Sequence, residues 1–265
     1  MDRRNRLKIG LAAIALIGMP AAHAQTQPAP QPAAGATATA TIDPVAMQAL
    51  TAMGNYMKTL KSFEIHSKAT IQTSMDDTDL KVTLGLENIY RVQRPDAFFI
   101  ELRSDRQFRQ FFYDGKTFTV SVPRQSFYSA VSAPPTIKAV VDDIYDQYGV
   151  SLPLSDIFYW ADAGAPTDGI RSAVRVGYAK VGGADTDQFA FRGDSLDFQV
   201  WIARGAKPLP LKIAITDRSD PVRPSYEAEL SWNTAAKFTP ATFAFKPPSG
   251  ASKIQMAKLD SVEKP

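Results

Sequence analysis

Hydrophobic residues change their spacing several times along the chain. After Asp43-Pro44, a pair that suits the first turn of a helix, apolar side chains recur every three or four positions: Met47, Leu50, Met53, Met57 and Leu60. This spacing predicts a helix over residues 44–61. From residue 63 the spacing switches to strict alternation, with Phe63, Ile65, Ala69 and Ile71 on one side of an extended segment, which predicts a strand with one buried face.

Alternation continues for the next seventy residues. It predicts six strands, over residues 63–72, 80–86, 98–103, 107–113, 116–122 and 126–132. Short turns separate them, including Asp114-Gly115, a pair typical of a type I′ hairpin. Consecutive strands joined by short turns pair with their neighbours, so we expect an antiparallel meander.

A helical insert follows Pro134-Pro135. Apolar residues at helical spacing predict an amphipathic helix over residues 137–148, ended by Gly149: Ile137, Val140, Val141, Ile144, Tyr145 and Tyr148. A second, short helix is predicted to open at Pro153 and to carry Leu154, Ile157, Phe158 and Trp160. The same stripe suits a fixed core helix and a mobile lid, and the pattern does not separate them.

Five more strands are predicted after the insert, over residues 171–181, 186–191, 196–203, 209–218 and 225–232. A tail over residues 238–248 is expected to run extended and to bury Phe243 and Phe245. The fold class is therefore α+β. Because three helices are too few to cover both faces of eleven strands, we expect a half-open antiparallel β-barrel with an N-terminal helix and a two-helix lid inserted after strand six. Such a barrel encloses either a packed core or a ligand cavity.

The N-terminus has the features of a secretory signal peptide. Four basic residues precede an apolar run over residues 9–19, and Ala22-His23-Ala24 forms a cleavage site, so we expect residues 1–24 to be removed. Residues 25–41 contain mostly Pro, Ala, Thr and Gln and predict a flexible leader. Residues 42–265 then form a single domain. Cleavage lowers the net charge from +3 to zero, so the basic precursor is no sign of nucleic-acid binding.

Composition removes several kinds of chemistry. The chain has no Cys, which excludes disulfides, thiolate metal sites, a cysteine nucleophile and a lipid-modified N-terminal Cys. His66 is the one histidine that remains after cleavage, and it lies on the polar face of a strand, so a multi-histidine metal site is excluded and a serine triad is not indicated. Acidic pairs occur at residues 76–79, 142–143 and 185–187, where they suit solvated turns or a helix face. A carboxylate-based hydrolase is the second alternative function. No cofactor or metal is expected.

Five segments carry a resemblance to a known family. They read RVQRPDAFFIELRSD at residues 91–105, FFYDGKTFTVSVP at 111–123, LPLSDIFYW at 152–160, VWIARGAKPLPLKIAITD at 200–217 and FAFKPPSGA at 243–251. In these motifs the chain resembles a bacterial family of predicted periplasmic proteins, which is similar in pattern to the periplasmic lipoprotein carriers LolA and LolB. The resemblance implies an incomplete barrel with a helical lid over a cavity for acyl chains. It also implies a basic residue that controls the lid, for which Arg91 and Arg94 are the candidates.

Aromatic residues are concentrated in four consecutive predicted strands and the short helix. Core packing accounts for any one of them, but neighbours such as Phe98-Phe99 and Phe111-Phe112 place aromatics on both faces, which favours a ligand-lining role for the set. The candidate ligand-binding residues are Phe98, Ile100, Leu102, Phe111, Tyr113, Phe118, Tyr128, Val141, Ile144, Phe158, Trp160 and Trp201.

Basic residues gather near the strand ends. Arg91, Arg94, Arg106 and Arg109 are candidates for contact with a lipid headgroup or an anionic partner, and solvated strand edges that resist aggregation are the alternative. The sequence thus predicts a monomeric, non-catalytic protein of the Gram-negative periplasm, or one secreted beyond it. It is expected to bind lipid or an acylated protein, and possible partners include an envelope membrane protein. The first alternative is an envelope sensor or protein-interaction module without a ligand.

Overall fold

The computed structural model describes residues 41–75, 80–165 and 167–259. The predicted signal peptide, most of the leader and the acidic turn at residues 76–79 lie outside these ranges. The chain enters the fold through α1 (Pro44–Thr59), where the Asp43 side chain caps the helix by accepting a hydrogen bond from the N–H of Val45 at 2.8 Å. The predicted N-terminal helix is therefore confirmed and ends two residues early.

The first six strands form the predicted meander. They are β1 (Ser62–Ser74), β2 (Lys81–Gln93), β3 (Ala97–Arg103), β4 (Phe108–Tyr113), β5 (Thr117–Val122) and β6 (Phe127–Ser132). Each pairs antiparallel with the next. The turn between β4 and β5 differs from the prediction. Gly115 has φ +88° and Asp114 has no positive φ, which excludes type I′ because that turn needs two.

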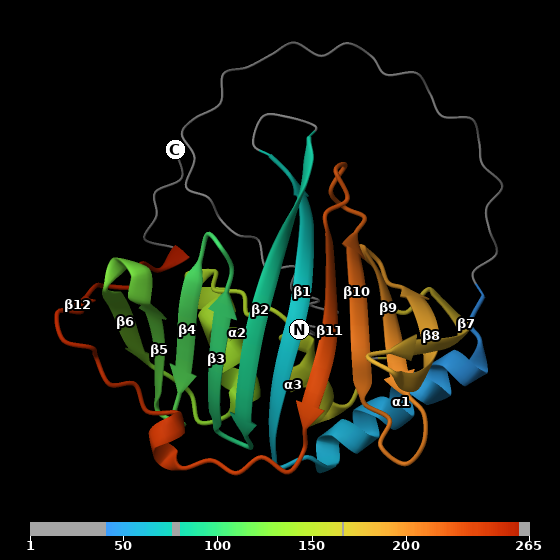
Figure 1. Cartoon of the computed structure of the whole chain (residues 1–265), viewed down its shortest axis with the longest axis horizontal. Helices are drawn as coiled ribbons and strands as arrows, with labels where there is room; N and C mark the ends of the chain where they lie inside the picture. Colours follow the sequence, from blue (N-terminus) through green and yellow to red (C-terminus); the bar gives the residue numbers. More distant parts are fainter. Residues whose placement is uncertain (1–40, 76–79, 166, 260–265) are drawn as a thin grey trace, which may run out of the picture.

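The last five predicted strands form a second meander. They are β7 (Ser172–Val181), β8 (Ala184–Arg192), β9 (Leu196–Ala203), β10 (Pro210–Asp217) and β11 (Ser225–Asn233). β11 pairs antiparallel with β1 and so joins both meanders into one sheet, with the order β12-β6-β5-β4-β3-β2-β1-β11-β10-β9-β8-β7 (Figure 1). The sheet curls without closing, which confirms the half-open antiparallel architecture.

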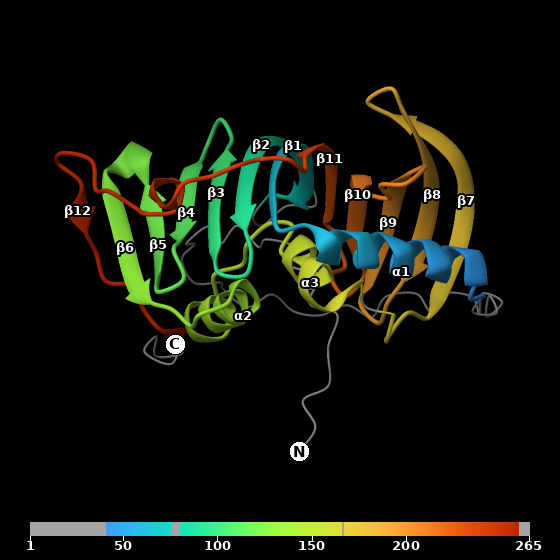
Figure 2. The ribbon, with the colours of Figure 1, turned by 90° about the horizontal axis from the view of Figure 1, so that it is seen from below.

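Three helices lie in the concavity of the curled sheet, as Figure 2 shows. α2 (Ile137–Tyr148) begins at Thr136, whose hydroxyl accepts from the N–H of Ala139, and ends at Gly149 with φ +66°. α3 (Asp156–Ala163) begins three residues after the predicted start. The reason is the backbone of Leu154, whose φ of +53° lies outside the helical region.

Side-chain alternation separates the two faces of the sheet. Along β9, Phe198, Val200 and Ile202 are buried, whereas Asp197 and Trp201 are half-buried on the opposite side. The buried side faces the helices, and α1 contributes Leu50, Met53 and Met57 to the same core. One continuous apolar core therefore fills the concave side and the convex side is largely polar.

The tail departs from the extended form that was predicted. It makes a 3-10 turn, η2 (Pro240–Thr242), and then a two-residue strand, β12 (Ser252–Lys253), that pairs parallel with β6. On the way it covers an apolar patch of the convex face, where Phe243 is buried with Ala97 and Phe99. Phe243 is buried as predicted, whereas Phe245 is half-buried and packs against Phe112 and Tyr128. The strand β12 adds a twelfth strand to the sheet.

Candidate functional site

A pocket of about 310 Å³ lies between the start of β1, the end of β2 and the helices α2 and α3. Apolar side chains from both layers form most of its wall. Charged side chains at its rim come from the turn after β2, from α2 and from α3. Its lining residues are Phe63, Val92, Arg94, Pro95, Thr136, Ile137, Lys138, Ala139, Asp142, Phe158, Ala161 and Asp162.

The deep wall of the pocket leads into a layer of stacked aromatic rings. Phe158 of α3 stacks on Phe98 of β3, with ring centroids 5.5 Å apart and planes at 24°. Phe98 in turn contacts Tyr113 at 5.3 Å and Phe118 at 6.4 Å. Rings at these distances attract one another beyond simple burial. The helices therefore rest on an aromatic floor, and α3 is held to the sheet through Phe158.

Polar contacts tie the two lid helices to each other. The hydroxyl of Tyr159 on α3 donates to Asp142 Oδ1 on α2 at 2.8 Å, and Lys138 Nζ donates to Asp142 Oδ2 at 2.8 Å. Burial, and then the adjacent Asp142 carboxylate, raise the pKa of Tyr159, so its hydroxyl stays protonated and remains a donor. The Tyr159–Asp142 hydrogen bond thus links α3 to α2, and the Lys138–Asp142 bond lies within α2.

Arg94 lies where the sheet, α1 and α3 meet. Its guanidinium donates to the carbonyl oxygens of Lys58 and Leu60 at 3.0 and 3.4 Å, at the C-terminal end of α1. It also forms an ion pair with Asp162 of α3 at 3.8 Å. A cation at a helix C-terminus satisfies free carbonyls and the negative end of the helix dipole. Of the two basic residues that the resemblance implied for lid control, Arg94 is the one that contacts α3.

The other predicted basic residues lie apart from the pocket. Arg91 projects from the convex face, donates to Glu64 Oε2 at 2.7 Å and covers the Phe99 ring at 5.5 Å. Burial acts to raise the pKa of Glu64, but hydrogen bonds from Arg91 and His66 outweigh it and lower that pKa. Arg106 is exposed in the turn after β3, and Arg109 is exposed on β4. The structure does not gather these arginines into one site.

The predicted ligand-binding residues divide between the two faces. Phe98, Ile100, Phe111, Tyr113, Phe118, Val141, Ile144, Phe158 and Trp160 are buried in the core around the aromatic floor, and Leu102 packs against it. Tyr128 lies on the convex face against Phe245, with ring centroids 5.0 Å apart. Trp201 lies on the convex face under Lys212 Nζ at 5.1 Å. Those last two are separated from the pocket by the sheet, so the interior site does not include them. Their ligand-binding role stays a prediction, as does that of the buried set.

The acidic residues at 185 and 187 are engaged by basic neighbours. Asp185 accepts from Lys180 and Tyr178, and Asp187 accepts from Arg175 and Arg204, so both serve ion pairs at the β7–β8 corner. Across residues 41–75, 80–165 and 167–259, no group of three or more His, Asp and Glu side chains could hold a metal ion. None of the helices in these ranges is long and apolar enough to cross a membrane.

Asp156 is an unusual acid because it is buried at the first position of α3, 7% exposed. Burial raises the pKa of its carboxyl from 3.8 to about 7, against a smaller opposing effect of a backbone hydrogen bond. The group therefore changes charge near neutral pH within α3, one of the two lid helices. This burial was not expected from the residue pattern, because Asp at a helix start is ordinarily a solvated cap.

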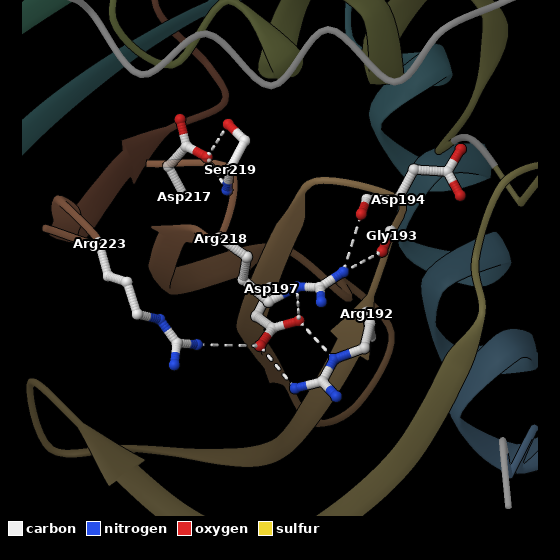
Figure 3. Close-up of polar contacts among 8 residues, drawn as sticks. All are labelled: Arg192, Gly193, Asp194, Asp197, Asp217, Arg218, Ser219 and Arg223. Atoms are coloured by element: carbon white, nitrogen blue, oxygen red, sulfur yellow. Dashed lines mark hydrogen bonds and ion pairs between the residues drawn. The ribbon is translucent and has the colours of Figure 1, made fainter. Parts of the chain in front are cut away.

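A cluster of arginines at the top of the sheet was also missed by the pattern analysis. Figure 3 shows Asp197 accepting from Arg192 at 2.8 Å and pairing with Arg218 at 3.0 Å and Arg223 at 4.0 Å. Hydrogen bonds from Arg192 are the largest influence on the pKa of Asp197, which is lowered. Arg218 also donates to the carbonyl oxygens of two turn residues between β8 and β9. The cluster links the turn between β8 and β9 to the turn between β10 and β11, which are distant in sequence, so its role is structural.

Together these features define a class of protein: an open, curled antiparallel sheet with a helical lid over a small apolar pocket. Residues 46–257 match the sequence model of the family described as "Predicted periplasmic protein (DUF2092)", and the chain belongs to that family. The family that the sequence motifs suggested is thereby confirmed. No curated protein matches the chain.

Several solved structures are similar to this fold at low sequence identity. LprF from Mycobacterium bovis is 15% identical over 80% of this chain and 100% of that chain, with a TM-score of 0.46. The lipoprotein LppX from Mycobacterium tuberculosis is 15% identical over 74% of this chain and 98% of that chain, with a TM-score of 0.45. A LolA superfamily protein from Nitrosomonas europaea is 9% identical over 76% and 97%, with a TM-score of 0.31.

Proposed function

We propose that this protein binds an apolar ligand in the periplasm, most favourably the acyl chains of a lipid or lipoprotein, between the α2–α3 lid and the concave face of the sheet. The observation that carries the proposal is the pocket of about 310 Å³ under the lid, with apolar walls and charged residues at its rim. Acyl chains need apolar walls, and their headgroups need a polar opening. The family description and the signal-peptide pattern support a periplasmic location.

The binding energy comes from burial of hydrocarbon surface. Each buried methylene group contributes roughly 0.8 kcal/mol, so about ten of them contribute roughly 8 kcal/mol before the costs of ordering. The pocket lies near the lower end of the usual range for ligand sites, roughly 300–1,000 Å³. A long chain therefore requires α2 and α3 to separate from the sheet, and the Phe158–Phe98 contact is the one that has to open.

Arg94 couples this opening to the rest of the fold. It contacts α1 and Asp162 of α3 simultaneously, so displacement of α3 breaks the ion pair while the hydrogen bonds to α1 persist. The released guanidinium then faces the pocket rim, where it can meet an anionic headgroup. The role of Arg94 as a headgroup contact rests on this geometry.

The first test is extraction of the mature chain, residues 25–265, purified from periplasm without detergent. Mass spectrometry of the organic extract should find an acyl species near one per protein. In addition, uptake of the fluorescent fatty acid cis-parinaric acid should fall at least tenfold in Ala139→Trp, because Ala139 lines the pocket. Tyr145→Trp is the matched control, since Tyr145 is exposed on the same helix and should leave uptake unchanged.

An empty protein that takes up no fatty acid would overturn the proposal. The alternative of a protein-interaction module would then lead. The surface that the structure offers for it is the edge strand β7, where Val174, Val176 and Tyr178 are 40%, 54% and 53% exposed. Exposed apolar strand edges are suited to pairing with another strand.

A further inference from the structure

Four polar side chains are buried in the middle of the concave face. Ser67 lies on β1, Asn88 and Tyr90 on β2, and Tyr226 on β11, three strands that are neighbours at the centre of the sheet (Figure 1). Ser67, Asn88 and Tyr90 are 2%, 1% and 1% exposed, and Tyr226 is 7% exposed. We name these residues the interior polar cluster.

Within the described residues, none of the polar side-chain atoms of the interior polar cluster makes a hydrogen bond of normal length and angle. This holds for Ser67 Oγ, both side-chain polar atoms of Asn88, and the hydroxyls of Tyr90 and Tyr226. Other buried groups of the same kind are paired, as the Tyr113 hydroxyl is with the carbonyl oxygen of Pro134. An unpaired buried polar group is costly, and folded proteins contain few of them. Five such atoms on three adjacent strands leave hydrogen-bonding capacity for a partner from outside the chain.

The strand register brings the cluster together. Ser67 lies directly opposite Asn88 across β1 and β2, and Tyr90 is two residues further along the same face of β2. Tyr226 lies opposite Ile71, four residues from Ser67 along β1. Between them the concave face carries two small residues, Ala69 and Ala228, which pair with each other and leave room for the tyrosine ring.

The pKa shifts of Tyr90 and Tyr226 also indicate that the members of the interior polar cluster lie close to one another. Burial raises the pKa of Tyr226, and side-chain hydrogen bonding with Ser67 and Asn88 opposes part of that rise. Burial also raises the pKa of Tyr90, with a further increase from Tyr226 and an opposing effect of Asn88. The groups that act on the two tyrosines are members of the cluster, and no charged residue is among them. The hydroxyls stay protonated and are hydrogen-bond donors at neutral pH.

The geometry points to a ligand subsite in which Ser67, Asn88, Tyr90 and Tyr226 bind the carbonyl oxygen of an uncharged acyl ester. Three hydroxyls and one amide offer several donors to a carbonyl oxygen. A charged carboxylate does not suit this place, because burial of an ion without a counter-ion is far more costly than burial of a neutral ester. The surrounding side chains, Leu86, Leu102 and Leu230, suit the hydrocarbon on either side of the ester.

This inference rests on the proposed function, since it places one polar group of the same apolar ligand. The cluster and the pocket share one face of β2, where Val92 lines the pocket and Tyr90 and Asn88 follow. Val92 and Asn88 are four residues apart, which is about 13 Å at the rise of an extended strand. An acyl chain that starts at the cluster can therefore run along β2 toward the lid.

The test compares two probes of equal size. Methyl palmitate carrying a carbonyl ¹³C label has one ester, and nonadecane has the same number of heavy atoms and no polar group. The full mature chain should bind the ester at least tenfold more tightly than the alkane, and the infrared carbonyl band of the bound ester should shift to lower frequency. Tyr90→Phe/Tyr226→Phe keeps both rings and removes both hydroxyls. This double variant should bind the ester no more than about threefold more tightly than the alkane. Its bound ester should show an unshifted carbonyl band, and its affinity for the alkane should be retained.

Tyr128→Phe is the matched control, because it removes a tyrosine hydroxyl from the convex face. It should leave both the preference and the carbonyl band unchanged. Equal binding of the two probes by the unaltered protein, with an unshifted band, would overturn the subsite and leave the proposed function standing. Binding of neither probe would overturn the proposed function itself.

Discussion

Replacing Asp156 with asparagine should change how the stability of the protein depends on pH. The folded protein holds the Asp156 proton up to about pH 7, whereas an unfolded chain releases it near pH 3.8. Between these values the folded state binds more protons than the unfolded state, so the free energy of unfolding falls as pH rises. Asparagine cannot ionise, and Asp156→Asn should lack this part of the pH dependence.

The magnitude follows from the size of the pKa difference. A difference of roughly three pKa units corresponds to about 4 kcal/mol once both states are ionised. Over the interval from pH 5 to pH 8 the contribution of Asp156 to the free energy of unfolding falls by roughly 2–3 kcal/mol. The pKa values of Glu64, Asp187 and Asp197 are lowered in the folded state, so these three groups stabilise the folded protein when they are ionised. This stabilisation is lost as pH falls through their folded-state pKa values, which lie below the interval from pH 5 to pH 8.

The assay is urea unfolding of the unaltered protein and Asp156→Asn at pH 5, 6, 7 and 8, followed by tryptophan fluorescence. The stability of the variant relative to the unaltered protein should increase by roughly 2–3 kcal/mol from pH 5 to pH 8. Asp168→Asn makes the same exchange at an exposed position in the loop after α3 and should give a profile parallel to that of the unaltered protein. Parallel profiles for Asp156→Asn and the unaltered protein would refute the assignment of a raised pKa to buried Asp156.

Three further substitutions test the helix contacts by thermal or urea unfolding. Gly54→Ala should destabilise the protein by about 1–3 kcal/mol, because the new Cβ would lie 2.3 Å from the backbone nitrogen of Ala165. This clash should outweigh the better helix propensity of alanine, and unchanged stability would contradict the close approach of the two backbones. Asp43→Ala should cost about 1 kcal/mol through loss of the α1 cap, and Asp43→Asn should restore most of it. Tyr159→Phe should cost about 1–2 kcal/mol by removing the hydrogen bond to Asp142, and a cost near zero would argue against a tie between the lid helices.

Local patterns predicted most of the fold because its elements are made by nearby residues. The strand at 63–72 and the hairpin around Asp114-Gly115, although not its turn type, required only neighbouring strands, and the stripe from Ile137 to Tyr148 required only one helix. Alternation also determines which side chains share a face. It did not determine which face the helices cover, and for that reason Trp201 was grouped with residues that lie on the other side of the sheet.

The features that the sequence did not predict depend on long-range pairing. Ser67 stands in an alternating run of buried residues, between Ile65 and Ala69, so its burial could have been inferred from position alone. Its proximity to Tyr226 could not, because that depends on the register between β1 and β11. The buried environment of Asp156 likewise arises only when the lid docks on the sheet.

The pairing of β1 with β11 has a consequence for how the protein folds. Each meander consists of neighbours in sequence and can form through short loop closures, whereas β1–β11 pairs residues from opposite ends of the domain, such as Glu64 with Asn233. Contacts between distant segments slow folding because a long chain must close before they form. We therefore expect closure of this seam to be the rate-limiting step, with two preformed half-sheets meeting edge to edge and burying Tyr226 only at the end.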